Sequence, residues 1–386
     1  MNGLNLRRIY ESKGPRFTCD LISEGIKEGK FKTENFSLLE LAEAFMGRDW
    51  VDNLNPRRKR GGVVLLEAGD AVDSTAFTNI TGQLFFSTVM QGFKTQGLIG
   101  DMLARTIPTS LSGKEKIPGL GQLPTDGEVV AEGMPYPHAG FGEDYIETPA
   151  KEKRGLITGI TREMIFDDRT GLVLDRARSV GERLAMNKEK RIIDLFIGAT
   201  NSYIWKGTAY NTYQTTTPWI NDLTGSANAL VDWKNVETAE LTLLDMTDPD
   251  TGDPIVIGGT KMVVPPALKW TANYVGNATE VRTVTNTNTT TIARSPNSGL
   301  PTEIISSSML KVRLKAMDAT NFNKYWFYGD PQAAFAYFEN WALEVLIEPP
   351  KAPSEFERDI VVRYKATEKG VPGVTQPRAI VRIKGA

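Results

Sequence analysis

The sequence offers few residues that could do chemistry, beginning with one histidine and one cysteine among 386 residues. A disulfide framework needs paired cysteines, a structural zinc site needs four nitrogen or sulfur ligands, and a Cys–His nucleophile needs both residues on a rigid core. All three kinds of site are therefore close to excluded. His138 lies in the run Tyr-Pro-His-Ala-Gly, which resembles a loop tip. A lone histidine in such a place is usually a surface side chain, and Cys19 fits a buried or half-buried thiol.

Two groups of carboxylates have a spacing that could indicate acid–base or calcium chemistry. Asp167 and Asp168 are adjacent at the start of a predicted helix, where capping and the helix dipole explain them better than catalysis does. Asp248, Asp250 and Asp253 could bind calcium, but the run lacks the rest of an EF-hand loop, including its terminal glutamate. We interpret this run as a turn.

Motifs that bind nucleotide phosphates are absent from the sequence. No Gly-x-x-x-x-Gly-Lys-Ser/Thr run occurs, and no strand leads through Gly-x-Gly-x-x-Gly into a helix. The densest positive run is Arg57, Arg58, Lys59 and Arg60, which Pro56 precedes and two glycines follow. An exposed, solvated turn is its simpler explanation, and contact with phosphate or with an acidic neighbour is the functional one. We therefore expect no catalytic residue, no cofactor and no metal ion.

Composition describes an ordinary globular protein with almost no net charge. Lys plus Arg number 45 against 47 Asp plus Glu, for a formal net charge of −2, so the free chain has no cationic field with which to bind DNA. Hydrophobic residues make up 40% and charged residues 24%, which excludes global disorder. The length suits two compact domains, or one domain with long excursions. The polar start and short apolar runs predict a soluble protein made in a reducing cytoplasm, without a membrane segment.

The strongest single element is a long helix predicted over residues 172–197. It follows the helix-start run at 167–170, contains no proline and ends at Gly198. At about 1.5 Å per residue it is roughly 40 Å long. Its apolar stripe is narrow, which suits a helix lying across one sheet. The stripe comprises Val173, Ala177, Val180, Leu184, Ile192, Leu195 and Phe196, and the far face carries Arg176, Arg178, Glu182, Arg183, Lys188 and Glu189.

Residues 110–163 predict a long two-stranded ribbon that projects from the body. The region is rich in Pro and Gly with alternating segments, and 155–161 reads as its returning strand. The N-terminal stretch, to about residue 55, reads as short helices that form a tail outside the core. A ribbon and a tail of this kind are poorly stabilised within one subunit, whereas over neighbouring copies they would bury apolar surface. The pattern therefore favours an assembly protein.

The other predicted elements alternate between helices and strands. Helices are expected at 36–46, with Ser37 as N-cap and Gly47 as the stop, at 236–246 and from about 267. The amphipathic stretch 73–91 is interpreted as the beginning of the main core. A polar loop with local strands is expected over 201–233, and a hairpin over 280–293. Single strands are expected at 254–257, 261–264, 310–314, 326–328, 357–363 and 377–383.

Several segments, in order, resemble the major capsid proteins of tailed bacteriophages. Residues 130–137, Val-Ala-Glu-Gly-Met-Pro-Tyr-Pro, resemble the acidic residue, glycine, small residue and proline of that family's projecting loop. Residues 160–168 resemble the strand that follows this loop, and residues 172–196 resemble the family's long spine helix. Residues 356–366 and 376–383 resemble its closing strands. The likeness covers most of the chain beyond about residue 75.

The resemblance implies an α+β fold of the Hong-Kong-97 type and a structural role without catalysis. It implies self-assembly into hexamers and pentamers that close an icosahedral virion capsid around double-stranded DNA, assembled in the host cytoplasm. It also suggests portal, scaffolding and decoration proteins as further partners. The near-neutral charge of the chain is compatible with a capsid wall past which the genome can slide. The implied domains are an N-terminal arm at 1–75, P-domain parts at 76–114 and 161–230, an E-loop at 115–160, an A-domain at 231–350 and closing P-domain strands at 351–386.

The sequence also departs from patterns seen in parts of that family. Some members cross-link subunits through a Lys in the E-loop and an Asn elsewhere, but no Lys occurs here between Lys116 and Lys151. We therefore predict no covalent mesh. Many relatives lose a long scaffolding segment to a protease; because this chain starts at Met1, we expect a separate scaffolding protein or none. A shortened N-terminus in particles, found by mass spectrometry, would refute this.

We expect the functional residues of this chain to make contacts and not to take part in chemistry. Met134, Tyr136, Phe141 and Tyr145 are the apolar and aromatic anchors of the ribbon, with local packing as an equal alternative. The basic run 57–60 is a candidate for contact with the inner surface or a neighbour. Two other functions stay open. One is an encapsulin-like nanocompartment of the same fold, and the other is a soluble hydrolase with an unrecognised carboxylate site, which predicts a monomer or small oligomer.

Overall fold

The computed structural model describes most of the chain, which folds into two compact units. The described residues are 3–28, 30, 37–46, 68–94, 97–118, 130, 145–167, 170–201, 203–248, 252–255, 261–277, 280–286, 289–294, 303–348 and 360–385. Unit 1 comprises Met1–Gln96, Lys153–Asn187 and Trp341–Glu368, and unit 2 comprises Gly97–Glu152, Lys188–Asn340 and Lys369–Ala386. Each unit is thus built from segments that lie far apart in the sequence.

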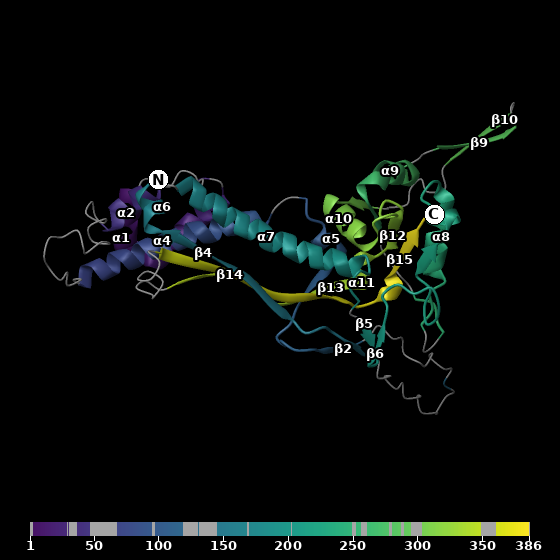
Figure 1. Cartoon of the computed structure of the whole chain (residues 1–386), viewed down its shortest axis with the longest axis horizontal. Coiled ribbons are helices and arrows are strands. Elements are labelled where there is room, and N and C mark those ends of the chain that lie inside the picture. Colours follow the sequence, from purple (N-terminus) through teal and green to yellow (C-terminus); the bar gives the residue numbers. More distant parts are fainter. Residues whose placement is uncertain are drawn as a thin grey trace. The chain divides into compact units, whose positions relative to one another are not determined.

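Unit 1 combines helices with parts of one mixed sheet. Its helices are α1 (Gly3–Lys27), α2 (Leu38–Met46), α4 (Ala68–Phe93), α6 (Arg162–Phe166) and the first part of α7 (Thr170–Phe196). Its strands are parts of β4 (Glu152–Thr161), β13 (Phe335–Ile347) and β14 (Ile360–Val374). In this unit the neighbouring strands have the order β13-β14-β4. In unit 2, β1 (Arg105–Pro108) runs parallel to residues 336–339 of β13. Figure 1 shows α1, α2 and α4 gathered together in this unit.

The apolar core of unit 1 includes the N-terminal helices. Leu6 and Ile22 of α1 and Phe45 of α2 are fully or almost fully buried, in one cluster with side chains of α4, α7 and β14. In the same core the ring of Phe85 stacks on that of Tyr364, with centroids 4.0 Å apart. The expectation of a tail outside the core is therefore wrong for the described residues. The reason is that α1 and α2 are amphipathic and bury their apolar faces against α4.

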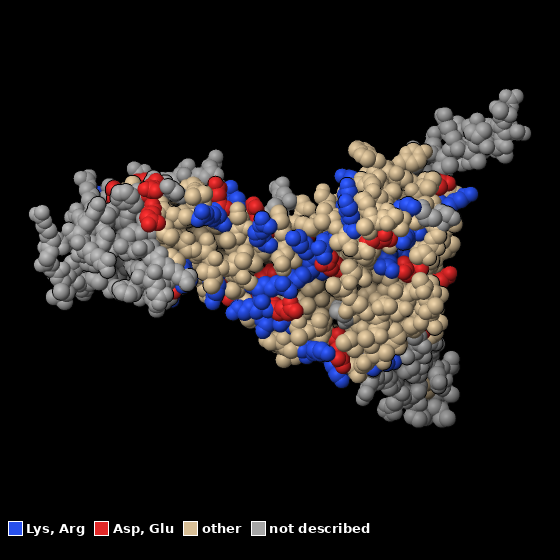
Figure 2. All heavy atoms as spheres, viewed as in Figure 1, with Lys and Arg blue, Asp and Glu red and all other residues tan. Residues whose placement is uncertain are grey.

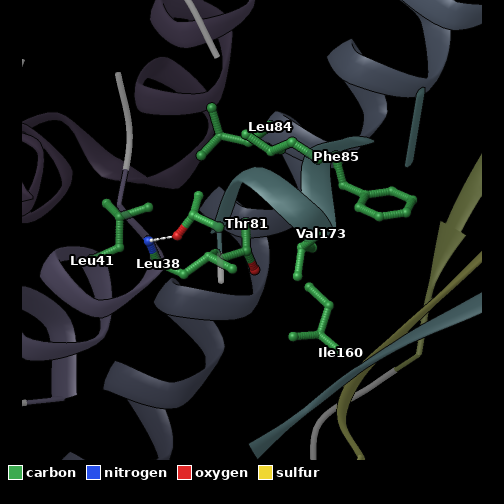
Figure 3. Close-up of a pocket in the computed structure, with 9 residues that line it drawn as sticks. Leu38, Leu41, Thr81, Leu84, Phe85, Ile160 and Val173 are labelled. Carbon is green, nitrogen blue, oxygen red and sulfur yellow. Dashed lines mark hydrogen bonds between the residues drawn. The ribbon is translucent and has the colours of Figure 1, made fainter. Parts of the chain in front are cut away.

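Helix α2 begins where the sequence predicts because Ser37 caps it. The Ser37 hydroxyl accepts a hydrogen bond from the backbone N–H of Glu40 at 3.2 Å. The backbone N–H of Leu38, the residue after Ser37, donates to Thr170 Oγ1 of α7 at 2.8 Å. A dashed line marks this bond in Figure 3. Beside this bond a cavity of about 10 Å³ remains, lined mainly by aliphatic side chains and Phe85 (Figure 3). It has room for about one water, so it is a small packing gap and not a ligand site.

Helix α7 confirms the long helix predicted over residues 172–197. It runs from Thr170 to Phe196, and Gly198 follows with a φ of 80°, a conformation that favours glycine. Apart from Val180, which is half-buried, the whole predicted apolar stripe is buried. Sequence periodicity alone therefore located both the helix and its buried face.

Glu189 corrects the prediction for the far face of α7. Its side chain is not solvated, because the residue is only 3% exposed. Its carboxylate oxygens accept hydrogen bonds from the backbone N–H groups of Ile99, at 2.9 Å, and Gly100, at 2.7 Å, where α5 (Gly100–Leu103) begins. Burial raises the pKa of Glu189, and the two N–H donors act in the opposite direction. The N–H groups at the start of α5 therefore compensate for the burial of this carboxylate.

Unit 2 contains a five-stranded sheet of order β11-β8-β12-β15-β7. Its strands are β7 (Asp222–Thr224), β8 (Lys261–Val264), β11 (Glu303–Ser306), β12 (Tyr325–Gly329) and β15 (Ile380–Lys384). Strand β12 is antiparallel to β8 and β15, while β11 and β7 run parallel to their neighbours. Helices α8 (Trp233–Leu244), α9 (Lys269–Asn277) and α10 (Ser308–Met317) share its core.

Smaller elements complete unit 2. A second sheet has the order β2-β3-β5-β6, from β2 (Lys116–Pro118), β3 (Tyr145–Glu147), β5 (Tyr203–Trp205) and β6 (Thr208–Tyr210). The hairpin of β9 (Glu280–Asn286) and β10 (Thr289–Arg294) extends away from α9 in Figure 1. Short helical pieces are α5, α11 (Pro331–Ala334), η2 (Ser226–Asn228), η3 (Pro266–Leu268) and η4 (Pro377–Ala379).

Strand β12 is the centre of the core of unit 2. Trp326, Phe327 and Tyr328 are consecutive and fully buried, so both faces of the strand are covered. The ring of Phe327 lies 4.6 Å from that of Phe196 in α7, and Trp326 Nε1 donates to the carbonyl of Asn228 at 3.0 Å. A continuous aromatic run therefore forms the middle of the sheet, as the prediction of a strand at 326–328 requires.

Most other predicted elements are confirmed and two are corrected, while the strands predicted at 254–257 and 357–363 lie partly outside the described residues. Residues 310–314 form part of helix α10, not a strand. The alternation of Leu310, Val312 and Leu314 imitates a strand, but Ser307 accepts a hydrogen bond from Met309 N at 3.2 Å as an N-cap. The two leucines, four residues apart, then share the buried helix face, while Val312 is 58% exposed. Likewise 377–379 form η4, and the last strand begins only at residue 380.

Candidate inter-subunit surfaces

The base of the predicted ribbon is present, but it is more than a two-stranded ribbon. Strands β2 and β3 pair antiparallel, with Lys116 opposite Glu147 and Pro118 opposite Tyr145. Strand β3 also pairs with β5, which pairs in turn with β6. The expectation of a ribbon with only two strands is thus wrong at its base. The reason is that β3 also pairs with β5, which satisfies the backbone groups on the second edge of β3. Residues 119–129 and 131–144 lie outside the described part.

A buried lysine ties the two legs of this excursion together. The side chain of Lys151 is 0% exposed, and its Nζ donates to the carbonyl of Gly113 at 3.1 Å and to Thr148 Oγ1 at 3.3 Å. It forms an ion pair with Glu115 Oε2 at 3.1 Å. The same oxygen accepts a hydrogen bond from the Thr109 hydroxyl at 2.5 Å; this bond and then Lys151 lower the pKa of Glu115. This ion pair and its hydrogen bonds therefore hold together the two chain segments between which the excursion begins and ends.

Of the predicted contact residues, Tyr145 is the one that falls among the described residues. It is half-buried in β3, with the Lys116 ammonium 4.0 Å from the centre of its ring. Its carbonyl accepts a hydrogen bond from the backbone N–H of Lys206 at 3.1 Å. These contacts are local packing, and a contact with another subunit remains a prediction. The predicted contacts outside the described residues are Met134, Tyr136, Phe141, Arg57, Arg58, Lys59 and Arg60, and His138 lies outside them as well.

The end of helix α7 is fixed by a cationic side chain from the last strand. Arg382 Nη1 donates to the carbonyl of Ile197 at 3.1 Å, where the negative end of a helix dipole favours positive charge. The guanidinium also makes a two-pronged contact with Asp222, at 3.0 Å and 2.6 Å, and lies 4.6 Å from the ring centre of Tyr213. The Tyr213 hydroxyl donates to the carbonyl of Phe196 at 2.5 Å, and burial raises its pKa. Chain segments 160 residues apart thereby meet at one helix end.

Two exposed apolar groups on helices of unit 2 were not identified from the sequence. On α9, Trp270 is 82% and Tyr274 is 72% exposed; on α8, Leu241 is 52% and Leu244 is 62% exposed. On α9 the buried residues are Ala272 and Val275, and a helical projection turns Trp270 and Tyr274 away from that face. Large exposed aromatic residues are the type that carries interface energy.

The described residues do not converge on a chemical site. Among them, no three His, Cys, Asp or Glu side chains lie together as metal ligands. Asp248, considered for calcium, is buried 3.6 Å from Arg378 Nη1, and Gly252 N donates to its carbonyl at 2.7 Å, which fits the predicted turn. In the part described, no helix has the length and apolar character of a membrane span. On the face shown in Figure 2, positive and negative side chains are interspersed.

Exposed apolar helix faces are features that favour association between subunits. The comparison with known families agrees. A sequence model of the phage capsid protein family matches residues 146–383, which is more than half of the chain, and the chain belongs to this family. It is therefore a structural component of a virion capsid that assembles with copies of itself. This confirms the resemblance found in the sequence, and the observed mixture of helices and sheets confirms the α+β class.

The comparison with solved structures found similar chain traces at low sequence identity. One is from Gordonia phage Cozz, with TM-score 0.45, 14% identity and coverage of 76% of this chain and 87% of that one. Another is the capsid of a native GTA particle, with TM-score 0.44, 13% identity and coverage of 76% and 91%. A third is a virus-like particle from Pyrococcus furiosus, with TM-score 0.38, 10% identity and coverage of 78% and 98%. No curated protein matches the sequence.

Proposed function

We propose that the chain is the shell subunit of an icosahedral phage capsid of the Hong-Kong-97 type, without catalytic activity. Its copies form hexamers and pentamers that enclose double-stranded DNA, and they assemble in the host cytoplasm. The observation that carries this proposal is the match of the phage capsid family to residues 146–383. The long helix α7 and the anchored excursion between β2 and β3 support it, because both are parts that the resemblance implies.

The domain roles follow the same resemblance. We assign residues 1–75 to an N-terminal arm, 115–160 to an E-loop and 231–350 to an A-domain, with the P-domain formed by 76–114, 161–230 and 351–386. Helices α1 and α2 contribute buried apolar residues to the core of unit 1. We therefore assign contact with neighbouring copies to the E-loop rather than to these two helices. Lys151 supports this role, since a loop that lies over another subunit needs a rigid root.

The enclosed DNA makes no sequence-specific contact in this proposal. The net charge of −2 gives the wall little attraction for phosphate, which suits a genome that must slide during packaging. Portal, scaffolding and decoration proteins are the other partners that we propose for the shell.

Assembly and content of the particles test the function. The full chain is expressed, particles are sought by negative-stain microscopy, and purified particles are treated with nuclease before their content is extracted. Rings or closed shells that protect double-stranded DNA, in cells that also carry the packaging proteins, are the expected result. Shells that hold a protein cargo and never nucleic acid would instead indicate a nanocompartment. A monomer with hydrolase activity would overturn the proposal.

The contact residues predicted from the sequence have their own test. Replacing Arg57, Arg58, Lys59 and Arg60 together by Ser is expected to reduce the yield of filled particles. Replacing Met134, Tyr136 and Phe141 by Ser is expected to leave folded subunits that do not form shells. Normal, filled particles from either variant would remove that group of residues from the interface.

A further inference from the structure

Helix α9 presents an aromatic surface with a positive charge, which we call the α9 patch: Lys269, Trp270 and Tyr274. The two aromatic residues are one helical turn apart and therefore lie on the same face. Both are more than 70% exposed, although Ala272 and Val275 of the same helix are buried. In the described part of the chain, Lys269 has no ion-pair partner, while its carbonyl accepts from Asn273 Nδ2. The patch is thus an apolar surface with an unpaired cation.

Helix α8 presents the complementary surface, which we call the α8 patch: Glu237, Leu241, Leu244 and Asp245. The glutamate, the first leucine and the aspartate follow each other at intervals of four residues, so they lie along one exposed row, and Leu244 is beside it. The buried residues Val236, Ala239 and Leu243 are on the other side of the helix. Among the described residues, neither carboxylate has an ion-pair partner. The patch is an apolar surface between two unpaired anions.

The two patches occupy different places on unit 2. Helix α8 contacts strands β12 and β15, whereas helix α9 contacts β8 and β11. The two helices therefore contact different pairs of strands in the same sheet. Aromatic side chains bury about 150–250 Å² each in a core or an interface, so the exposed Trp270 and Tyr274 offer a large area for burial. Their chemistry fits leucines bordered by carboxylates better than it fits a second aromatic, cationic patch.

We propose that the α9 patch of one copy of this chain docks on the α8 patch of the next copy. This rests on the proposed function, since it names the surface through which capsid subunits associate. In the contact, Trp270 and Tyr274 cover Leu241 and Leu244, and Lys269 meets the carboxylates of the α8 patch. Because each copy offers one patch and accepts the other, the contact is heterologous and repeats around a ring.

The area of the contact sets its strength. The exposed part of two aromatic side chains is well below the roughly 800 Å² per partner of a stable protein–protein interface. One such contact is therefore weak, and a closed ring holds together because every copy makes two. Reversible single contacts also permit wrongly placed subunits to leave, which a growing shell requires.

Truncation of the aromatic patch is the first test. The double variant Trp270→Ala/Tyr274→Ala is compared with wild type and with Val312→Ala, which removes an exposed apolar side chain from α10 in the same unit. Circular dichroism checks that all three are folded. Sedimentation is expected to show that the double variant needs at least ~30-fold more protein for half-maximal assembly, while Val312→Ala assembles like wild type.

Disulfide trapping tests the pairing itself. In a Cys19→Ser background, the variants Trp270→Cys and Leu244→Cys are purified separately, mixed and oxidised. The expected product is a dimer that contains one chain of each kind, whereas Val312→Cys mixed with Leu244→Cys gives none. In a parallel experiment, Lys269→Glu is expected to weaken assembly, and Glu237→Lys with Asp245→Lys on the same chain is expected to restore it.

The outcomes separate this inference from the proposed function. If wild type forms shells, but the aromatic double variant does so equally well and no mixed dimer is trapped, the docking contact is refuted and the capsid function stands. Equal trapping with the Val312 control also refutes it. If wild type forms neither rings nor shells under any condition, the proposed function fails, and the contact fails with it.

Discussion

Gly92 of helix α4 and Gly181 of helix α7 sit where the two helices touch, each against the backbone of the other. A Cβ atom on Gly92 would lie 2.2 Å from the carbonyl oxygen of Arg178, and one on Gly181 would lie 2.1 Å from that of Val89. These distances are far inside van der Waals contact, so only glycine permits this approach. The pair therefore fixes the packing of the long helix in unit 1.

Replacing Gly181 by Ala is expected to destabilise the protein by about 1–3 kcal/mol, because the added methyl group must push two backbones apart. Gly171, also in α7, is the matched control, since nothing lies within 4 Å of an added Cβ there. Gly171→Ala should be neutral or slightly stabilising, as expected for a helical glycine. Urea unfolding of the full-length subunits measures both. Equal effects of the two substitutions would contradict the close approach of α4 and α7.

Loss of Arg382 is expected to be costly because it leaves Asp222 without its partner in a largely buried place. The side chains are 18% and 11% exposed, and Arg382→Ala should lose about 3 kcal/mol of unfolding free energy. Arg382→Lys keeps the charge but not the two-pronged geometry, so an intermediate loss is expected. Arg183→Ala is the control, because Arg183 is exposed on α7 and has no partner among the described residues.

The double variant Arg382→Ala/Asp222→Ala sharpens this test. It should lose less than the sum of the two single variants, since no charge is left uncompensated. Additive losses would mean that the ion pair contributes nothing specific to the end of helix α7.

Stability in acid is expected to depend on Asp318. The backbone N–H of Asn321 and then the ammonium of Lys384, at 3.0 Å, hold the pKa of Asp318 far below its ordinary value of 3.8. For a carboxyl group with a lowered folded-state pKa, the stabilisation is present above the ordinary value and is lost as the pH falls through the folded value. Asp318→Asn should therefore be less stable than wild type at pH 6, and this difference should shrink below pH ~4.

Thermal unfolding between pH 6 and pH 2.5 measures the difference. The control is Glu43→Gln, which changes an exposed carboxylate with no described partner and should follow wild type throughout. A constant gap between Asp318→Asn and wild type across this range would show that the substitution acts through packing and not through the proton.

Mature particles are expected to contain no covalent links between subunits. The sequence has no Lys between Lys116 and Lys151. The structure adds that the Lys151 amine is buried in its ion pair with Glu115, where it cannot reach another chain. A denaturing gel of boiled particles should therefore show one band at the monomer mass. A ladder of multiples that resists reducing agent would refute this prediction.

Local patterns predict the long helix well, and they fail where a distant partner decides the outcome or where a short apolar run fits two periods. The run from 172 to 197 was predictable because the buried stripe repeats with the helical period and Gly198 stops it. Glu189 was placed on the wrong face because nothing nearby in sequence announces that Ile99 and Gly100 supply two N–H donors, 89 or 90 residues away. The strand expected at 310–314 failed because three alternating apolar residues fit both periods, and the cap at Ser307 resolved the choice.

One of the candidate surfaces can be predicted from the sequence, whereas the others cannot. The sequence pointed to the excursion and to Tyr145, since prolines, glycines and aromatic residues there are visible without a fold. It did not point to Trp270, Tyr274, Leu241 or Leu244, because a large apolar residue in an amphipathic helix is by default a core residue. Exposure depends on which face the sheet covers, and that is set by strands from other parts of the chain.

Periodicity, capping and composition are local properties, so they already establish the long helix with its stop, the scarcity of reactive groups and the likeness to phage capsid proteins. Three features become visible only in the folded chain: the N-terminal helices belong to the core of unit 1, glycines let α4 and α7 meet, and Arg382 closes the end of α7. Those features depend on contacts between distant segments, whose free energy exists only once the chain has brought them together.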